Sequence, residues 1–294
     1  MKRTIVALSV ALPLLVACKE KPDAAAPPPV TTSSAPAPAP AATTTAAPAT
    51  GTAPDVTAAN ASVPAQGLEL WLRGDYGVTA GSDGKVTSWA VEGSPFKATP
   101  SQPAEQPSLV ASALNGKPAV RFDGKQNTLE VPMSIDPKVS PQLTVISVWS
   151  SATAEKTPFR KLYGADNGGY DRAAGIDDRS EGSNYTVFGG SAGVVGSFTF
   201  TANTPNLTVE SYDQAQKKLN TWANGAARSN VEAEYNESLD HFFIGSTGRV
   251  YHELWQGDLA EMLVYRRVLT DDERKKVEDY LAGKYGLKLE RPAP

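Results

Sequence analysis

Every aromatic residue of this chain lies at or beyond Trp71. The sequence contains 5 Trp, 10 Tyr and 8 Phe, and residues 19–66 contain none of them. That segment is almost entirely Ala, Pro and Thr, which offer little surface to bury, and proline interrupts helices and central strands. A folded core can therefore be built only from residues 67–294. Residues 19–66 are expected to be a disordered, semi-extended linker that could reach on the order of 100 Å.

The first 18 residues have the pattern of a secretory signal. Lys2 and Arg3 form a positive start, and an apolar stretch follows from residue 5 to residue 17. That stretch is shorter than the roughly 20 apolar residues needed to span a bilayer. It fits a signal peptide better than a stable transmembrane anchor.

The signal ends in Leu15-Val16-Ala17-Cys18, which resembles the lipobox of bacterial lipoproteins. The resemblance implies cleavage before Cys18 and attachment of diacylglycerol to its sulfur. Cys18 is the single cysteine, so it cannot form an internal disulfide; a buried free thiol is the alternative. More than one acyl chain gives stable membrane attachment. An Asp directly after the lipidated Cys favours retention in the inner membrane; residue 19 is Lys, which implies the outer membrane.

Short β-like runs separated by turn residues fill the rest of the chain. Examples are "LELWLR", "KVTSWAV", "LTVISVWS", "YTVFGG", "SFTFTA" and "LAEMLVYRR". Many short strands at this spacing predict an all-β sandwich or barrel, and about 225 residues fit one such domain. We place this domain at residues 67–290.

One helix is predicted near the end of the chain. Thr270 followed by Glu273 forms a capping box, and the acidic first turn suits the helix dipole. Val277 and Leu281 continue an apolar stripe, whereas residues 274–276 are expected to face water. Either of two glycines, Gly283 or Gly286, could end the helix.

Several of these segments resemble one known family. "GLELWLRGDYGV", "LNGKPAVRFDG" and "WQGDLAEMLVYRRVLTDDERKKVEDYLAGKYGLK" are similar to segments of bacterial laminin-G-like, concanavalin A-like domains. The resemblance implies a jelly roll of two curved antiparallel sheets. It implies no single activity, because this fold hosts lectins, adhesion modules and glycosidases.

Two acids in the last β-like run raise the possibility of catalysis. Related β-glucan hydrolases place the first two of their carboxylates two residues apart on one strand, so that both point to the same face. Asp258 and Glu261 are three apart, which predicts opposite faces, and Glu253 is expected in the preceding loop. We therefore interpret these acids as structural and expect no catalysis, with a glycoside hydrolase of unusual carboxylate placement as the alternative.

Two further patterns could indicate chemistry. Gly189-Gly190-Ser191-Ala192-Gly193 matches a nucleophile elbow, but that elbow needs a helix after it, and "VVGSFTF" is β-like; a glycine-rich turn is the simpler interpretation. His241 and His252 could approach each other across a hairpin. No third ligand is evident, and zinc sites usually need three or four protein ligands.

The densest group of oxygen ligands lies in "GADNGGYDRAAGIDDRSEG". Ca²⁺ takes six to eight oxygen ligands, often from such loops. We predict a speculative calcium site here; a solvated polar loop is the alternative. Its ligands would be Asp166, Asn167, Asp177 and Asp178.

Aromatic side chains near turns could stack against sugar rings. The candidates are Tyr170, Tyr185, Tyr251 and Trp255. We therefore expect a lipid-anchored envelope protein whose domain binds glycan or protein ligands; a structural lipoprotein without a soluble ligand is a further alternative. The formal net charge of −4 and the lack of a basic stripe argue against nucleic acid as a partner.

Overall fold

The computed structural model of the protein describes residues 62–91 and 93–291. The predicted signal peptide, the lipidation site at Cys18 and the linker up to residue 61 lie outside the described residues. Within the described ranges, no helix is both long enough and apolar enough to cross a membrane.

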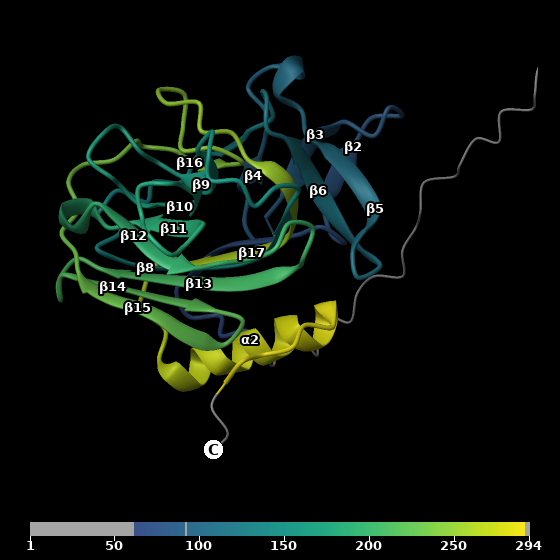
Figure 1. Ribbon diagram of the computed structural model, residues 1–294. Coiled ribbons are helices and arrows are strands. Elements are labelled where there is room, and N and C mark those ends of the chain that lie inside the picture. Colours follow the sequence, from purple (N-terminus) through teal and green to yellow (C-terminus); the bar gives the residue numbers. More distant parts are fainter. Residues whose placement is uncertain (1–61, 92, 292–294) are drawn as a thin grey trace, which may run out of the picture. The chain divides into compact units, whose positions relative to one another are not determined.

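Most of the described chain forms two antiparallel sheets that face each other (Figure 1). The larger sheet has eight strands in the order β15-β14-β13-β8-β17-β6-β5, with β1 also paired to β17. Their bounds are β1 (Leu68–Arg73), β5 (Ser108–Leu114), β6 (Lys117–Asp123), β8 (Gln142–Ser151), β13 (Asn206–Asp213), β14 (Lys218–Ala223), β15 (Ala226–Glu232) and β17 (Gln256–Tyr265).

The second sheet has six strands in the order β12-β11-β10-β9-β16-β7. These are β7 (Leu129–Val131), β9 (Arg160–Gly164), β10 (Ala173–Ile176), β11 (Tyr185–Phe188), β12 (Val194–Phe198) and β16 (Phe242–Ile244). A small third sheet, which the sequence did not predict, contains β2 (Val78–Ala80), β3 (Val86–Ala90) and β4 (Lys97–Ala98). Two short 3₁₀ turns are η1 (Pro103–Glu105) and η2 (Gly190–Ala192).

The main core lies between the two large sheets. Trp149 sits at its centre, stacked on Tyr185 at 4.8 Å between ring centroids and edge-on to Trp255 at 5.3 Å. Strand β8 buries both faces: Val145 and Trp149 point into this core, whereas Ile146 and Val148 point to the other side. This two-sided burial explains why its sequence is an almost continuous apolar run.

Helix α2 (Asp271–Tyr285) covers the opposite face of the large sheet (Figure 1). Val277, Leu281 and Tyr285 pack with Trp71 and Leu263 in a second cluster. The predicted all-β antiparallel jelly roll with one C-terminal helix is thus confirmed. The described fold begins before residue 67, because Val63 is buried in this same cluster.

The ends of α2 follow the local signals in the sequence. Thr270 and Glu273 form the predicted capping box, and Gly286, with φ of 62°, ends the helix, while Gly283 lies within it. The expectation that Arg274 faces water is wrong. Its guanidinium is buried because it pairs with Glu278 at 2.8 Å and lies 4.4 Å from the ring centre of Trp222.

Candidate functional site

The two acids of strand β17 lie on the same face of the large sheet, contrary to the prediction of opposite faces. Leu259 pairs with Trp149 and Glu261 with Val148, so Ala260 is an extra residue in a bulge. A bulge of one residue restores the face that three-residue spacing would reverse. Both carboxylates therefore point to the outer side of the large sheet, away from the six-stranded sheet.

Both of these carboxylates have protein partners. Asp258 accepts two hydrogen bonds from Arg121, at 2.7 and 2.9 Å. Glu261 accepts from Trp71 Nε1 at 2.7 Å, Lys284 Nζ at 2.7 Å and Tyr285 Oη at 2.8 Å. These contacts tie β17 to β6, β1 and α2, and they support the structural interpretation of the pair.

The glycine-rich segment around Ser191 is a turn between β11 and β12. It contains only the three-residue η2 and leads directly into a strand, and Ser191 Oγ accepts a hydrogen bond from the backbone N–H of Glu234 at 3.0 Å. His241 Nδ1 lies 3.6 Å from Glu130. His252 lines a hollow that His241 does not line, so the two histidines do not share a site. Among residues 62–91 and 93–291, no three His, Cys, Asp or Glu side chains are grouped to hold a metal ion.

The outer face of the six-stranded sheet has a buried ionic network. Lys161, with no exposed surface, donates to Asp177 at 2.9 Å and lies 4.1 Å from the ring centre of Phe188. Arg179 also donates to Asp177, with Nε at 2.7 Å. Burial opposes ionisation of Asp177, but the hydrogen bonds from Arg179 and the charge of Lys161 hold the pKa of this carboxyl below its ordinary value.

Above this network lies a pocket of about 290 Å³, which we call the tyrosine pocket. Its lining side chains come from four separate segments of the chain, and two glycines complete the wall. These residues are Asp166, Gly168, Gly169, Tyr170, Arg179, Phe188, Tyr251 and Glu253. The Arg179 guanidinium lies 5.4 Å from the ring centres of both Tyr170 and Phe188, so the pocket combines aromatic faces with a fixed cation.

The backbone at the rim of the tyrosine pocket is strained. Tyr170 has φ of 60° and His252 has φ of 50°, values that a bulky residue rarely adopts. Gly168 and Gly169 also have positive φ, at 108° and 133°. A Cβ at Gly168 would lie 2.5 Å from Tyr251 Oη, so the Tyr251 side chain reaches this loop and would have to move to admit a side chain there. Such strain persists only where the surrounding fold imposes it, and it concentrates at functional sites.

Exposed apolar side chains gather at this rim. Five large hydrophobic side chains are exposed among the described residues: Tyr76, Val139, Tyr170, Val250 and Tyr251. Two of the five, Tyr170 and Tyr251, line the tyrosine pocket, and Val250 precedes Tyr251 in the same loop. Exposed rings around a polar hollow are characteristic of ligand sites.

The acids of the tyrosine pocket are incompletely paired. Glu253 Oε1 lies 3.5 Å from Arg179, while its buried Oε2 has no hydrogen-bond partner within the described residues. Burial raises the pKa of Glu253 and that of Asp166. Burial also raises the pKa of Asp171 to about 6; this side chain accepts the backbone N–H of Asn167 and so helps to shape the loop.

The four predicted calcium ligands do not converge. Both oxygens of Asp177 bind Lys161 and Arg179, and Asp178 is exposed to solvent. Asp166 Oδ1 accepts the backbone N–H groups of Gly168 and Asp171. Asn167 points into a separate hollow. Calcium binding remains a prediction from the sequence.

The predicted ligand-contacting aromatics fall into two groups. Tyr170 and Tyr251 lie together at the tyrosine pocket. Tyr185 and Trp255 are fully buried in the core between the sheets, where the Tyr185 hydroxyl bonds to Glu210 at 3.1 Å. The structure corrects the prediction for these last two, because neither ring has a face open to a ligand.

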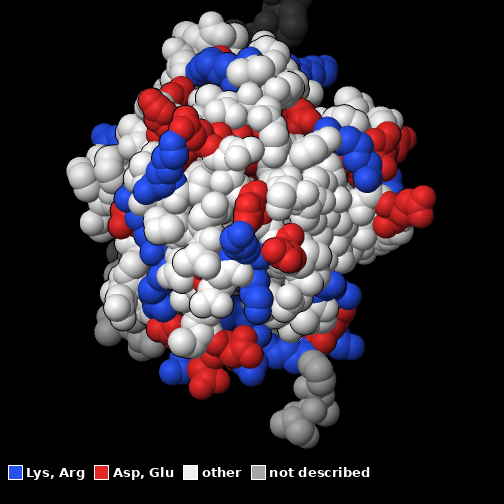
Figure 2. All heavy atoms as spheres, turned by 90° about the vertical axis from the view of Figure 1, so that its left-hand side faces the viewer, with Lys and Arg blue, Asp and Glu red and all other residues white. Residues whose placement is uncertain are grey.

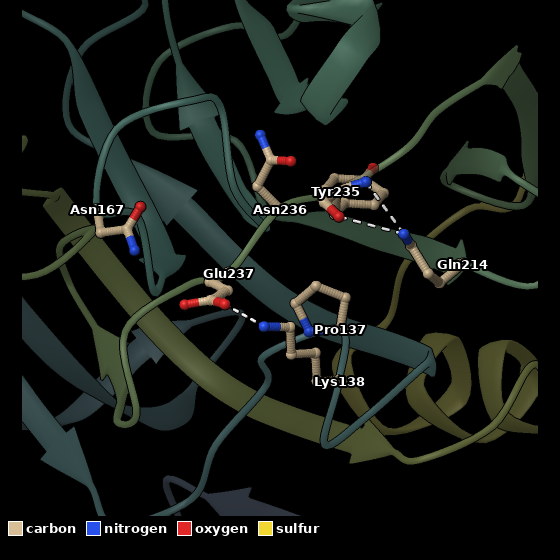
Figure 3. Close-up of a pocket in the computed structure, with 7 residues that line it drawn as sticks. All are labelled: Pro137, Lys138, Asn167, Gln214, Tyr235, Asn236 and Glu237. Atoms are coloured by element: carbon tan, nitrogen blue, oxygen red, sulfur yellow. Dashed lines mark hydrogen bonds and ion pairs between the residues drawn. The ribbon is translucent and has the colours of Figure 1, made fainter.

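A wider hollow lies on the other side of the loop that carries Tyr170. We call it the amide groove; its volume is about 650 Å³ (Figure 3). It is lined by Pro137, Lys138, Asn167, Gln214, Tyr235, Asn236 and Glu237. In Figure 3 the Lys138–Glu237 ion pair crosses the middle of the groove, and the Gln214 amide is held by the backbone of Tyr235.

Several residues in and beneath the tyrosine pocket are not predicted from the sequence. The sequence pattern does not single out Arg179, and it predicts Glu253 only as a loop residue near a catalytic pattern. Phe188, and Lys161 in the ionic network beneath the pocket, are not predicted either. Alternation in "YTVF" does place Phe188 opposite the buried Tyr185 and Val187, so Phe188 could have been found. Nothing local indicates that Glu253 meets Arg179, because 74 residues separate them.

Comparison with known proteins identifies the fold. No protein-family model matches the chain, and no curated protein matches it. Among solved structures, the chain is similar to Trypanosoma rangeli sialidase in complex with sialic acid, at 14% identity and a TM-score of 0.54. It is also similar to domain 4 of AbnA, a GH43 extracellular arabinanase from Geobacillus stearothermophilus, in complex with arabinotriose, at 14% identity and a TM-score of 0.51.

The extent of the match differs between these two. The similarity to the sialidase covers 76% of this chain but 34% of that one, so this chain corresponds to about a third of the sialidase. The similarity to the arabinanase domain covers 72% of this chain and 97% of that domain. At such identities these likenesses show a shared fold alone.

Proposed function

We propose that this domain is a glycan-binding module and that the tyrosine pocket is its binding site. The observation that carries the proposal is the pair of exposed rings, Tyr170 and Tyr251, on the two sides of a polar hollow. Sugar rings present C–H faces that stack on aromatic rings and hydroxyls that bond to polar groups. Arg179 and the carboxyl groups of Asp166 and Glu253, which line the hollow, supply those polar groups.

The comparison adds support of a coarser kind. The arabinanase domain, which this chain matches over nearly its whole length, is described in complex with a trisaccharide. On the face drawn in Figure 2, basic and acidic side chains are interspersed without a large area of one sign. This distribution fits a ligand recognised by stacking and hydrogen bonding better than a polyanion.

The setting of the module follows from the N-terminal sequence. We propose that lipid on Cys18 anchors the protein in the envelope, in the outer membrane, and that the Pro/Ala/Thr-rich segment holds the domain away from the bilayer. Cell fractionation of a Cys18→Ala variant tests the anchor. Loss of the protein from the membrane fraction is expected; retention there would refute lipidation as the means of attachment.

A glycoside hydrolase is the second candidate, on one specific observation. Asp166 and Glu253 line the same pocket, and burial raises the pKa of both. Glycosidases use two carboxyl groups across the scissile bond, one of which is held protonated. This pair replaces Asp258 and Glu261 as the catalytic candidates.

A binding screen distinguishes these functions. The purified protein is tested against a panel of soluble glycans and cell-wall polymers, with Ca²⁺ and with EDTA, and products are analysed for released sugars. We expect binding without cleavage, and a loss of about fivefold to tenfold in affinity for Tyr251→Ala, from ~1–1.5 kcal/mol of lost stacking. Tyr76→Ala is the matched control, since Tyr76 is exposed but lies outside the pocket.

Other outcomes would change the assignment. No binding to any glycan, or equal binding by Tyr251→Ala, would refute the proposed site. Released sugars that disappear in Glu253→Gln and Asp166→Asn would establish the hydrolase. Loss of binding in EDTA would support the calcium prediction.

A further inference from the structure

We infer that the binding surface continues from the tyrosine pocket across the loop of residues 166–170 into the amide groove, so that the ligand is an uncharged oligosaccharide chain rather than a single sugar. The inference rests on the proposed function and specifies its ligand class. It depends on the relation of the two hollows, on the free hydrogen-bonding groups of the groove and on its balanced charge.

The two hollows share one loop. Asp166, Gly168, Gly169 and Tyr170 face the tyrosine pocket, while Asn167 faces the amide groove. The loop is therefore a ridge between the two hollows.

The ridge is low and fixed in place. Gly168 and Gly169 carry no side chain, and a Cβ at Gly169 would meet nothing nearer than Asn236 Nδ2 at 3.8 Å. The backbone N–H of Gly190 holds the Tyr170 carbonyl at 2.9 Å, which anchors the end of the ridge. The Tyr251 hydroxyl lies against the ridge at Gly168, so a bound chain can cross without displacing a side chain only at Gly169.

The amide groove offers groups that suit sugar hydroxyls. The side-chain amides of Asn167 and Asn236 have no hydrogen-bond partner in the described part of the chain, and both residues are exposed. Each amide has two N–H donors and an accepting oxygen, which match the paired hydroxyls of a sugar ring. Gln214 is different, because its amide is already bonded to the backbone N–H and C=O of Tyr235.

The charge and shape of the groove narrow the ligand class. Its two charged groups, Lys138 and Glu237, pair with each other, so the groove has no net charge. Its aromatic residue, Tyr235, is only 5% exposed and gives little stacking surface. The groove therefore adds hydrogen bonds to an uncharged chain whose main anchor is the stacking at Tyr170 and Tyr251. Its volume, within the range of ligand sites, is more than twice that of the pocket.

The test is the dependence of affinity on chain length. Isothermal titration of the full protein uses arabinan, xylan and cellulose oligosaccharides of two to six rings, with oligogalacturonates as a charged series. For at least one neutral series we expect affinity to rise about tenfold or more between two rings and five. The Asn167→Ala/Asn236→Ala variant should abolish this rise while leaving the affinity for the shortest bound oligosaccharide within about twofold.

Controls separate the inference from the proposed function. Asn230→Ala, on the exposed edge strand β15, should behave as wild type, and Tyr251→Ala should weaken every length. Length-independent binding, an equal loss at all lengths in the double Asn variant, or preference for oligogalacturonates would overturn the inference and leave the glycan-binding function standing. Absence of binding to all series in wild type would overturn both.

Discussion

Two buried glutamates eight residues apart show how the two outer faces of this sandwich differ. Glu261 lies beneath α2 and receives hydrogen bonds from Trp71, Lys284 and Tyr285. Glu253 lies at the tyrosine pocket with one oxygen 3.5 Å from Arg179 and the other without a partner in the described structure. Complete hydrogen bonding offsets the cost of burying a carboxylate, whereas an incompletely bonded buried carboxylate marks a candidate functional site.

The covering elements explain this difference. Helix α2 closes the outer face of the large sheet with apolar side chains and supplies Lys284 and Tyr285 to the acid beneath it. Where the tyrosine pocket opens on the outer face of the six-stranded sheet, loops rather than a helix provide the cover, and two of them place Tyr170 and Tyr251 in solvent. The closed face is therefore expected to contribute stability, and the open face carries the pocket that we propose as the binding site.

The largest expected effect is on the closed face. Glu261→Ala leaves the Lys284 ammonium, the Trp71 N–H and the Tyr285 hydroxyl without their shared partner, which should cost about 3–5 kcal/mol of unfolding free energy. Glu253→Ala should cost less than about 1 kcal/mol, because one of its oxygens has no bond to lose. Urea unfolding of both variants measures the contrast. Equal losses would show that the two acids do not differ in this way.

A third buried glutamate sharpens the comparison. Glu210 lies in the core, where the Tyr163 and Tyr185 hydroxyls each donate a hydrogen bond to it at 3.1 Å. Burial raises the pKa of Glu210 to about 8, although these hydrogen bonds act to lower it. The folded protein keeps the proton up to about pH 8, whereas the unfolded chain releases it near pH 4.5. The contribution of Glu210 to stability therefore falls as pH rises from 4.5 to 8 and is constant above.

Glu210→Gln removes this titration. Relative to wild type, its unfolding free energy should increase as pH rises through that window, by on the order of 5 kcal/mol in total. Thermal or urea unfolding at pH 5, 7 and 9 measures the difference. Glu232→Gln, at an exposed position on β15, is the control and should show no such trend. A pH-independent difference for Glu210→Gln would mean that Glu210 is ionised in the folded core.

The smallest effect concerns the acid that first suggested catalysis. The Arg121 side chain is 52% exposed in its ion pair with Asp258, and solvent weakens such a pair. Asp258→Asn should cost less than about 1 kcal/mol of stability and should leave glycan binding unchanged. Binding loss without unfolding would move the site to the outer face of the large sheet.

The sequence predicted those parts of the fold that local patterns control. Most of the β-like runs, the Thr270–Glu273 capping box and the apolar stripe of α2 depend on residues close in the chain and appear in the structure; the run "SFTFTA" is an exception, because its strand β12 ends at Phe198. The bulge at Ala260 was not predictable from spacing, because pairing with β8 creates it. That single extra residue reversed the expected relation of Asp258 and Glu261.

The candidate site was predictable only in part. Tyr170 and Tyr251 could be predicted because each lies beside turn residues in the sequence, where an aromatic ring is often exposed. Tyr185 and Trp255 have the same local appearance, but packing around Trp149 buries them. Asp177 was predicted as a calcium ligand because other acids lie near it in the sequence. Its partner in the folded protein is the Lys161 ammonium, 16 residues away, and the local sequence does not indicate this ion pair.

The most direct test of the account is to locate a bound oligosaccharide by backbone-amide NMR. The longest oligosaccharide that binds in the length series is titrated into isotopically labelled protein. The account predicts the largest shift changes at residues 166–170, 235–237 and 251–253, on both sides of the glycine ridge. Changes confined to α2, or to the residues around Asp258, would contradict it.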